Sequence, residues 1–383
     1  MSAYLDHASG WPPSDAVRDA MTHWVGVATS PMALHEHARG PADLVDATRA
    51  ALGALVGWPA DTVILTSGAT EARNLAINGS LSARGLRTPV IALDPLAHGS
   101  ALAAARSLTR DGGAVRMAAV GPVGDVLPDA MADAARGADL VVVTHGQAEV
   151  GCVRDAAALI SAARAAAPTA VVVLDAEETA GLLPVPDGLG ADLVVMGGRS
   201  MGGPAWAGAL LVRPGTLLHP LIEGGLEEYG KRGGAHDLPA IAGIAAAAGE
   251  ALQAMPARAE AMRASAARMV ADLLRVPEVV LNGPPVPERL PGHVQVSARG
   301  VEGEALALAM AARDVAVSPG SACTFGAGKS SPVLEAMGAD DDVARGAVLI
   351  TAGPGTTDAE LTMATRAFAE SVAALRAMAP AGE

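Results

Sequence analysis

Between residues 62 and 212 the sequence alternates short, continuously apolar runs with longer segments that are mostly rich in alanine. A strand that is apolar at every position is buried on both faces, which is typical of a parallel sheet covered by helices. We therefore predict an α/β fold with a seven-stranded, mixed and mostly parallel sheet. The expected strands lie at residues 63–65, 90–93, 115–120, 140–143, 171–174, 193–196 and 209–212. A short glycine-rich connection joins the last two runs, so one strand there is expected to be antiparallel.

Helical periodicity flanks this region on both sides. Residues 14–29 and 42–57 are expected to form helices, and residues 238–275 carry long alanine-rich helices that lead into a second domain. Residues 278–383 then alternate strands and helices in the manner of a smaller α+β domain. The predicted organisation is a large α/β domain at residues 14–255. Residues 1–13 and 256–383 form the small domain.

Composition excludes several classes of protein. Apolar residues make up 51% of the chain and charged residues 18%, which is incompatible with disorder. The formal net charge of -14 argues against a general nucleic-acid or anionic-membrane binder. The N-terminus does not resemble a secretory signal, and no uninterrupted apolar run reaches the ~18 residues that a membrane span needs. Two widely spaced cysteines suggest a reducing compartment, so we expect a soluble, cytoplasmic protein.

One of the two cysteines, Cys323, lies in a loop of small, turn-forming residues at 317–328. A free cysteine is often a small buried hydrophobe, and that remains the alternative interpretation. A cysteine placed among Gly, Ser and Pro is instead exposed and able to move, which favours a chemical or metal-ligating role. The other cysteine, Cys152, is expected at the start of a helix and partly packed.

Polar residues follow the expected strands at the edge where open α/β sheets carry their chemistry. The turn at residues 66–71, Thr-Ser-Gly-Ala-Thr-Glu, leads into a helix and suits a bound phosphate, although such turns often serve only as caps. Asp175 ends one strand, where its carboxylate could pair with a cationic ring nitrogen or merely cap the next segment. His98 lies just past another strand end.

Two further patterns carry less weight. His35 and His37 lack a third ligand at a supportive spacing, so we interpret them as loop histidines rather than as a metal site. Gly328-Lys329-Ser330 is similar to part of a nucleotide-binding loop, but Cys323 stands where the first glycine of that motif is required.

Taken in this order, the motifs resemble those of the cysteine desulfurases, which belong to the class V group of fold-type-I enzymes dependent on pyridoxal phosphate (PLP). The resemblance covers essentially the whole chain and rests most on the turn at residues 66–71 and the Gly-Ser-Ala-Cys-Thr loop at 320–324. It implies a homodimer whose active sites draw on both chains. It also implies a role for each matching residue. The phosphate is held by Thr70 and the amides of Gly68 and Ala69. His98 stacks on the ring, Asp175 faces the pyridine nitrogen, and Cys323 carries the persulfide.

The sequence departs from this pattern where the chemistry is most demanding. The lysine that binds PLP corresponds to Ser200, and the histidine before it to Arg199. Only an amine forms an imine with PLP and then moves the substrate proton. Lys231 and Lys329 are the only lysines in the chain, and neither aligns with that position.

Four more positions of the family pattern are changed. Ala148 replaces an asparagine that contacts the cofactor ring, and Glu178 replaces a glutamine beside it. Ala235 replaces a threonine given to the phosphate of the neighbouring chain, and Leu349 replaces the arginine that would bind the substrate carboxylate. These losses together predict a site that is no longer selected for desulfuration.

The sequence therefore predicts a degenerate desulfurase-like protein. In it PLP is not covalently bound and is either absent or weakly held, and Cys323 acts in iron–sulfur cluster assembly or sulfur transfer. Cys323 would carry a persulfide, ligate iron of a cluster, or dock a scaffold or sulfur-acceptor protein. One alternative is a residual enzyme that uses non-covalent PLP or another phosphorylated ligand, gripped by Thr70 and Arg199. Another is a structural partner of an active paralogue.

Overall fold

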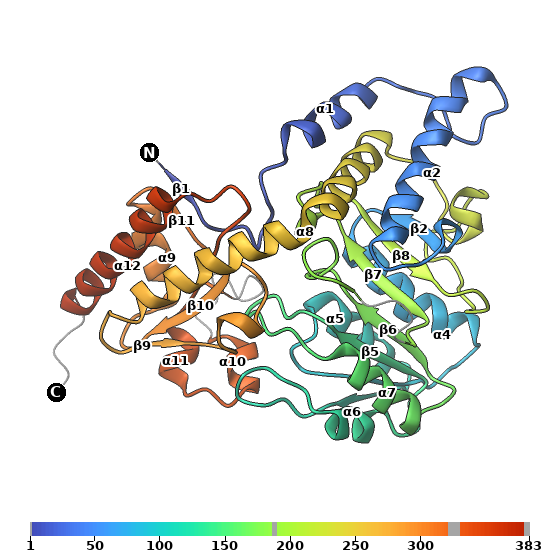
Figure 1. The fold of residues 1–383 in the computed structure, drawn as a ribbon. Helices are drawn as coiled ribbons and strands as arrows, with labels where there is room; N and C mark the ends of the chain where they lie inside the picture. Colours follow the sequence, from blue (N-terminus) through green and yellow to red (C-terminus); the bar gives the residue numbers. More distant parts are fainter. Residues whose placement is uncertain (1, 186–189, 321–329, 379–383) are drawn as a thin grey trace.

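The computed structural model describes residues 2–185, 190–320 and 330–378. The chain forms a larger body built around a broad sheet and a smaller body beside it, and one long helix runs across both (Figure 1). Cys323, Thr324 and Lys329 lie outside the described residues.

The large sheet has seven strands in the order β2-β8-β7-β6-β5-β3-β4. Only β8 runs antiparallel to its neighbours, and the remaining pairings are parallel. The predicted mixed, mostly parallel sheet is thus confirmed. Its strands are β2 (Val63–Thr66), β3 (Val90–Leu93), β4 (Ala114–Met117), β5 (Leu140–Thr144), β6 (Val171–Asp175), β7 (Leu193–Gly197) and β8 (Gly208–Val212).

Helices cover both faces of this sheet, which explains why its strands are continuously apolar. Along β5, Val141 and Val143 belong to one hydrophobic core while Leu140 and Val142 belong to the other. The helices of this body are α1 (Asp15–Trp24), α2 (Arg39–Ala54), α3 (Ala69–Asn74), α4 (Ser80–Ala83), α5 (Gly99–Thr109), α6 (Pro128–Ala135) and α7 (Ala156–Ala166).

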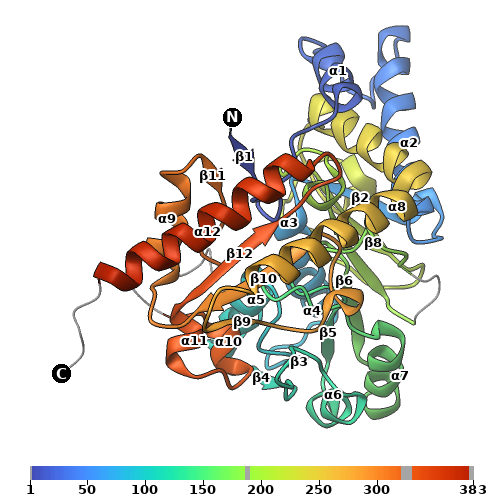
Figure 2. The same cartoon turned by 60° about the vertical axis from the view of Figure 1, so that its left-hand side comes forward.

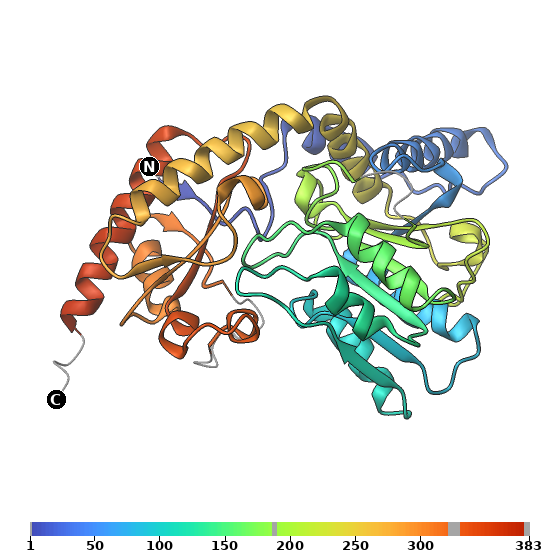
Figure 3. The same ribbon diagram turned by 60° about the horizontal axis from the view of Figure 1, so that its bottom comes forward.

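The helix α8 (Leu238–Leu273) is continuous through Pro256 and serves two cores. Ile244 packs in the core of the large body, whereas Met269 packs in the core of the small one. Figure 3 shows it crossing above both bodies. By length and composition alone this helix could cross a membrane, but 50% of its most apolar window is buried inside the molecule. A core helix with two apolar faces gives the same pattern.

The small body contains an antiparallel sheet of β9 (Val279–Leu281), β10 (His293–Ala298) and β12 (Ala347–Thr351), in the order β12-β10-β9. Its helices are α9 (Gly303–Ala311), α10 (Pro332–Ala336), α11 (Asp341–Arg345) and α12 (Asp358–Met378). The N-terminal strand β1 (Ala3–Tyr4) joins this body by pairing with β11 (Val315–Ala316). Figure 2 shows α12 lying along β12. The domain limits at 13/14 and 255/256 stay a prediction.

Some predicted limits were wrong. The first helix ends at Trp24 rather than at residue 29, because Val25 is extended and Gly26 takes a φ of 91°, which glycine adopts most readily. The strand predicted at 115–120 ends at Met117 and lies at the edge of the sheet, where it is largely exposed. Cys152 does not begin a helix. It forms an isolated bridge with Arg289, and α7 starts only at Ala156.

Candidate functional site

The candidate site lies where the central strands of the large sheet end. Asp175 is the last residue of β6, and residues 198–201 follow β7 directly. Ligands bind at this edge in open α/β sheets. The structure fills it with charged side chains that pair with one another.

The centre of the site is a buried ion pair between Arg73 and Asp175. Arg73 points from α3 so that its Nε lies 2.6 Å from Oδ2 of Asp175 and its Nη2 lies 3.1 Å from Oδ1. Both side chains are only 3% exposed. Nη2 of Arg73 also donates to Glu177. Bidentate pairs of this kind are the strong form of the arginine–carboxylate interaction.

A second arginine extends this pair into a cluster. Arg199 donates to Glu177 and Glu178 and also to the backbone carbonyl of Ala8. The cluster, which we call the Arg73 cluster, holds two guanidinium groups against three carboxylates and contains Arg73, Asp175, Glu177, Glu178 and Arg199.

Burial and pairing shift the pKa values in the Arg73 cluster. Burial opposes ionisation of Glu177, but Arg73 and Arg199 outweigh it and lower its pKa to about 2. For Glu178 burial prevails, and its pKa is raised despite Arg199. The pKa of His98 is lowered, first by burial and then by the charge of Arg73. Glu177 is therefore held as an anion, while His98 favours the neutral form.

The resemblance aligns Ser200 with the lysine of the family pattern. In the structure, its hydroxyl is hydrogen-bonded to the backbone. Its side chain is buried, and its hydroxyl donates to the carbonyl of Glu177 and, at 3.4 Å, to that of Ala180. The hydroxyl therefore stabilises the turn after β6. Its role in binding a cofactor stays a prediction.

The turn predicted to hold a phosphate lies between β2 and α3. Gly68 has a φ of 131°, and a side chain there would approach the carbonyl of Ala205 to 3.1 Å, so glycine is required. The amide of Ser67 donates to Glu71 at 2.7 Å, and Glu71 in turn pairs with Arg232. The side chain of Thr70 is exposed, whereas Ala69 is buried. The carboxylate of Glu71 thus accepts the hydrogen bond of one backbone amide in this turn, and that amide is not free to donate to a phosphate.

His98 caps the N-terminus of α5. Its Nδ1 accepts from the amide of Ser100 at 3.1 Å, which leaves the ring near the charges of the Arg73 cluster. The structure thus gathers His98, Asp175, Glu178 and Arg199 around one buried centre. The sequence analysis did not identify Arg73 or Glu177 as site residues. The one signal available for Arg73 was its place in the segment that leads from the turn after the first strand into a helix.

The other substituted positions of the family pattern lie on separate elements. Leu349 is buried in β12, where its backbone exchanges two hydrogen bonds with Ser318. It offers no charge to a carboxylate. Ala148 is half-buried in the turn after β5, and Ala235 is exposed in the segment before α8.

The two ends of the Cys323 loop are described, although the cysteine is not. At one end, a side chain at Gly320 would come within 2.9 Å of Nε2 of Gln295. At the other, Ser331 donates to the buried Glu149, which also accepts from Gln295 at 3.0 Å. Burial raises the pKa of Glu149. These contacts bring both ends of the loop to the boundary between the two bodies.

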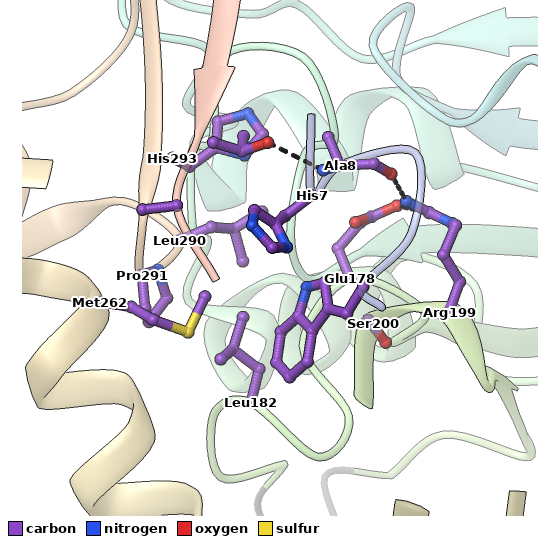
Figure 4. Close-up of a pocket in the computed structure, with 13 residues that line it drawn as sticks. His7, Ala8, Glu178, Leu182, Arg199, Ser200, Met262, Leu290, Pro291 and His293 are labelled. Atoms are coloured by element: carbon purple, nitrogen blue, oxygen red, sulfur yellow. Dashed lines mark hydrogen bonds and ion pairs between the residues drawn. The ribbon is translucent and has the colours of Figure 1, made fainter. Parts of the chain in front are cut away.

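A cavity of about 30 Å³ lies beside the Arg73 cluster, between the two bodies. Glu178, Arg199 and Ser200 line one side of it, and His7 and His293 line the other (Figure 4). It has room for little more than one or two water molecules, whereas small-molecule sites commonly measure ~300 Å³ or more. Among the described residues there is also no group of three or more His, Cys, Asp or Glu side chains able to hold a metal ion. The rings of His35 and His37 meet edge to face, with centroids 5.9 Å apart.

Comparison with known proteins shows the family and the fold to which this chain is similar. The aminotransferase class-V family matches residues 3–350. The fold is that of a solved NifS-like protein, with a TM-score of 0.89 and 23% identity over 97% of this chain and 100% of the other. The apo structure of a cysteine desulfurase from Thermococcus onnurineus NA1 gives a TM-score of 0.84 at 18% identity, over 97% of this chain and 95% of the other.

Sequence similarity to curated proteins narrows the class. The chain is 33% identical to "Cysteine desulfurase IscS" of Anaeromyxobacter dehalogenans, over 98% of this chain and 94% of the other. It is 32% identical to "IscS-like cysteine desulfurase" of Mycobacterium tuberculosis, over 99% of each chain. The chain therefore belongs to the class V aminotransferase family and is a relative of its cysteine desulfurases.

Members of this family use PLP, but the described residues do not fit it. PLP needs an amine for its aldehyde and a free carboxylate for its ring nitrogen. The resemblance aligns Ser200 with the amine position, and the hydroxyl of Ser200 donates to backbone, while both oxygens of Asp175 accept from Arg73.

Proposed function

We propose that this protein is a desulfurase-like protein that has lost PLP chemistry and acts in sulfur transfer or iron–sulfur cluster assembly through Cys323. The observation that carries the proposal is the Arg73 cluster together with Ser200, because they replace the two groups on which desulfuration depends. What remains of the family pattern is the thiol loop at 320–324. The names of the similar proteins, which include IscS, support sulfur handling as the setting.

The contrast between the two cysteines supports Cys323 as the working thiol. Cys152 is 4% exposed, and burial raises the pKa of its thiol. A thiol that is buried and protonated is a poor nucleophile and a poor metal ligand. That leaves Cys323 to carry a persulfide, to ligate iron or to contact an acceptor protein.

The proposal also includes a partner. We propose that the chain works in the cytoplasm as a homodimer that docks a scaffold or sulfur-acceptor protein. Large apolar side chains that are more than half exposed support an interface on the large body; between residues 206 and 229 they are Trp206, Leu217, Leu226 and Tyr229.

Competitive alkylation at neutral pH, followed by peptide mapping, tests which thiol reacts. Cys323 is expected to be labelled well before Cys152. In a reconstituted assay that measures cluster formation on a scaffold protein, Cys323→Ser should lose the effect of the parent protein, while Cys152→Ser keeps it. Equal performance of Cys323→Ser and the parent would refute the role of this thiol.

Loss of desulfuration is tested separately by sulfide release from L-cysteine with PLP added. The rate is expected to stay at background. Ser200→Lys alone should not restore it, because Leu349 still offers no charge to the substrate carboxylate and Arg73 still occupies Asp175. A rate comparable to that of active family members would refute the proposal.

A further inference from the structure

The Arg73 cluster leaves Asp175 with little capacity for another partner. Its Oδ2 accepts from Nε of Arg73 at 2.6 Å, and its Oδ1 accepts from Nη2 at 3.1 Å and from the amide of Glu177 at 3.3 Å. A guanidinium is planar, delocalised and always charged. It therefore offers Asp175 the same things as a protonated pyridine ring: a flat cation and an N–H donor.

We propose that Arg73 is a built-in replacement for the cationic ring of PLP, so that this protein excludes the cofactor instead of merely lacking the lysine that would anchor it. This goes beyond the proposed function, because it holds whether or not Cys323 transfers sulfur. In this proposal Arg73 is the residue that excludes the cofactor. The change at position 200 removes the covalent anchor but does not by itself prevent non-covalent binding.

Charge burial explains why PLP cannot displace Arg73. For the ring to reach Asp175, the guanidinium would have to leave both Asp175 and Glu177 while remaining inside the protein, since Arg73 is only 3% exposed. An unpaired buried charge is strongly unfavourable. The Nη1 atom of Arg73 is already buried without a hydrogen-bond partner among the described residues, so the guanidinium gains nothing by moving away from the two carboxylates that it has.

The Arg73 cluster also joins the two bodies without a cofactor. Arg199 donates to the carbonyl of Ala8, and the amide of Ala8 donates to Oγ1 of Thr351 at 2.8 Å. Asp175, Arg73, Glu177 and Arg199 thus form a continuous chain of polar contacts that ends on β12 of the small body. The arrangement of the two bodies is therefore expected not to respond to added cofactor.

The test uses two probes on the purified full chain. PLP is titrated while tryptophan fluorescence and the melting temperature are followed. Pyridoxamine 5′-phosphate is titrated in parallel, because it lacks the aldehyde that would label Lys231 or Lys329 nonspecifically. The parent protein is expected to show no saturable quenching and no shift in melting temperature with either probe.

Variants identify the residue responsible. Arg73→Asn/Glu177→Ala removes one positive and one negative charge and is expected to bind pyridoxamine 5′-phosphate roughly tenfold or more tightly than the parent. Arg73→Lys keeps a cation near Asp175 and should still exclude both probes. Arg154→Asn breaks an equally buried pair with Asp94 and should gain no affinity.

Four results would overturn the proposal. They are saturable binding of either probe by the parent, saturable binding by Arg73→Lys, no gain in the double variant, and an equal gain in Arg154→Asn. If the double variant does not fold, the parent titration and Arg73→Lys still decide the question, because binding by either protein contradicts exclusion. Labelling of Cys323 is measured independently, so failure here and failure of the sulfur-transfer proposal are distinguishable.

Discussion

The large body contains two buried, bidentate arginine–aspartate pairs that differ in how completely the hydrogen-bonding groups of the arginine are satisfied. Arg154 and Asp94 are 1% and 0% exposed, and every nitrogen of the guanidinium donates either to Asp94 or to the carbonyl of Gly124. Arg73 is buried just as deeply against Asp175, but its Nη1 has no partner among the described residues.

This difference distinguishes a structural pair from a substituted one. Buried polar groups are almost always hydrogen-bonded when a fold has been built around them. The Arg154 pair meets that rule. The Arg73 pair meets it only in part. In the role proposed for Arg73, the ion pair satisfies the charge of Asp175 without reproducing the shape of a cofactor ring.

The largest expected effect is on stability. Arg154→Met leaves Asp94 buried with no other paired cation among the described residues and should lower the free energy of unfolding by about 3–5 kcal/mol. Arg73→Met also leaves Asp175 without its cation, but it should cost less, near the lower end at about 3 kcal/mol, because it removes a buried Nη1 that has no partner among the described residues. Chemical denaturation of both variants measures the difference. If Arg73→Met proved the more destabilising, the distinction between the two pairs would be wrong.

The next largest expected difference between the two pairs is in how the free energy of unfolding depends on acidic pH. The pKa of Glu177 is lowered to about 2, so its contribution is complete above its ordinary value near 4.5 and is lost as pH falls from there through about 2. The full shift corresponds to roughly 3 kcal/mol. Arg73→Met should flatten the pH dependence of unfolding in this window, while Arg154→Met keeps the slope of the parent. Identical slopes in all three proteins would contradict this.

The smallest effect concerns the edge of the Arg73 cluster. Ser200→Ala removes the hydrogen bond to the carbonyl of Glu177 and should cost about 1 kcal/mol. Ser80→Ala is a matched control, since Ser80 is also buried and donates to the carbonyl of Ala76. If the two variants lose similar free energy of unfolding, and Ser200→Ala still supports iron–sulfur cluster formation in the scaffold assay, then the Ser200 hydroxyl has a purely structural role. Loss of assembly would instead assign Ser200 a chemical role.

The fold was largely predictable because its signals are local and redundant. Continuously apolar strands, such as 171–174, required helices on both faces, and the structure places cores on both sides of the sheet. Asp175 was identified because it ends such a strand. Arg73 was not, since an arginine in a short helix usually points to solvent. Only the tertiary structure shows that it turns inward to meet a carboxylate 102 residues away.

The pairing of β1 with β11 has a consequence for the order of synthesis. Ala3 is hydrogen-bonded alongside Val315, and these residues stand 312 positions apart, since 315 minus 3 is 312. At about 5–20 residues per second, roughly 15–60 s of translation separates the two strands. Leu5 belongs to the core of the small body, so it cannot be buried until Val315 and the other late residues of that core have been synthesised. During that interval Ala3 and Leu5 lack the core in which they are buried, and truncation before residue 315 would leave β1 without its partner strand.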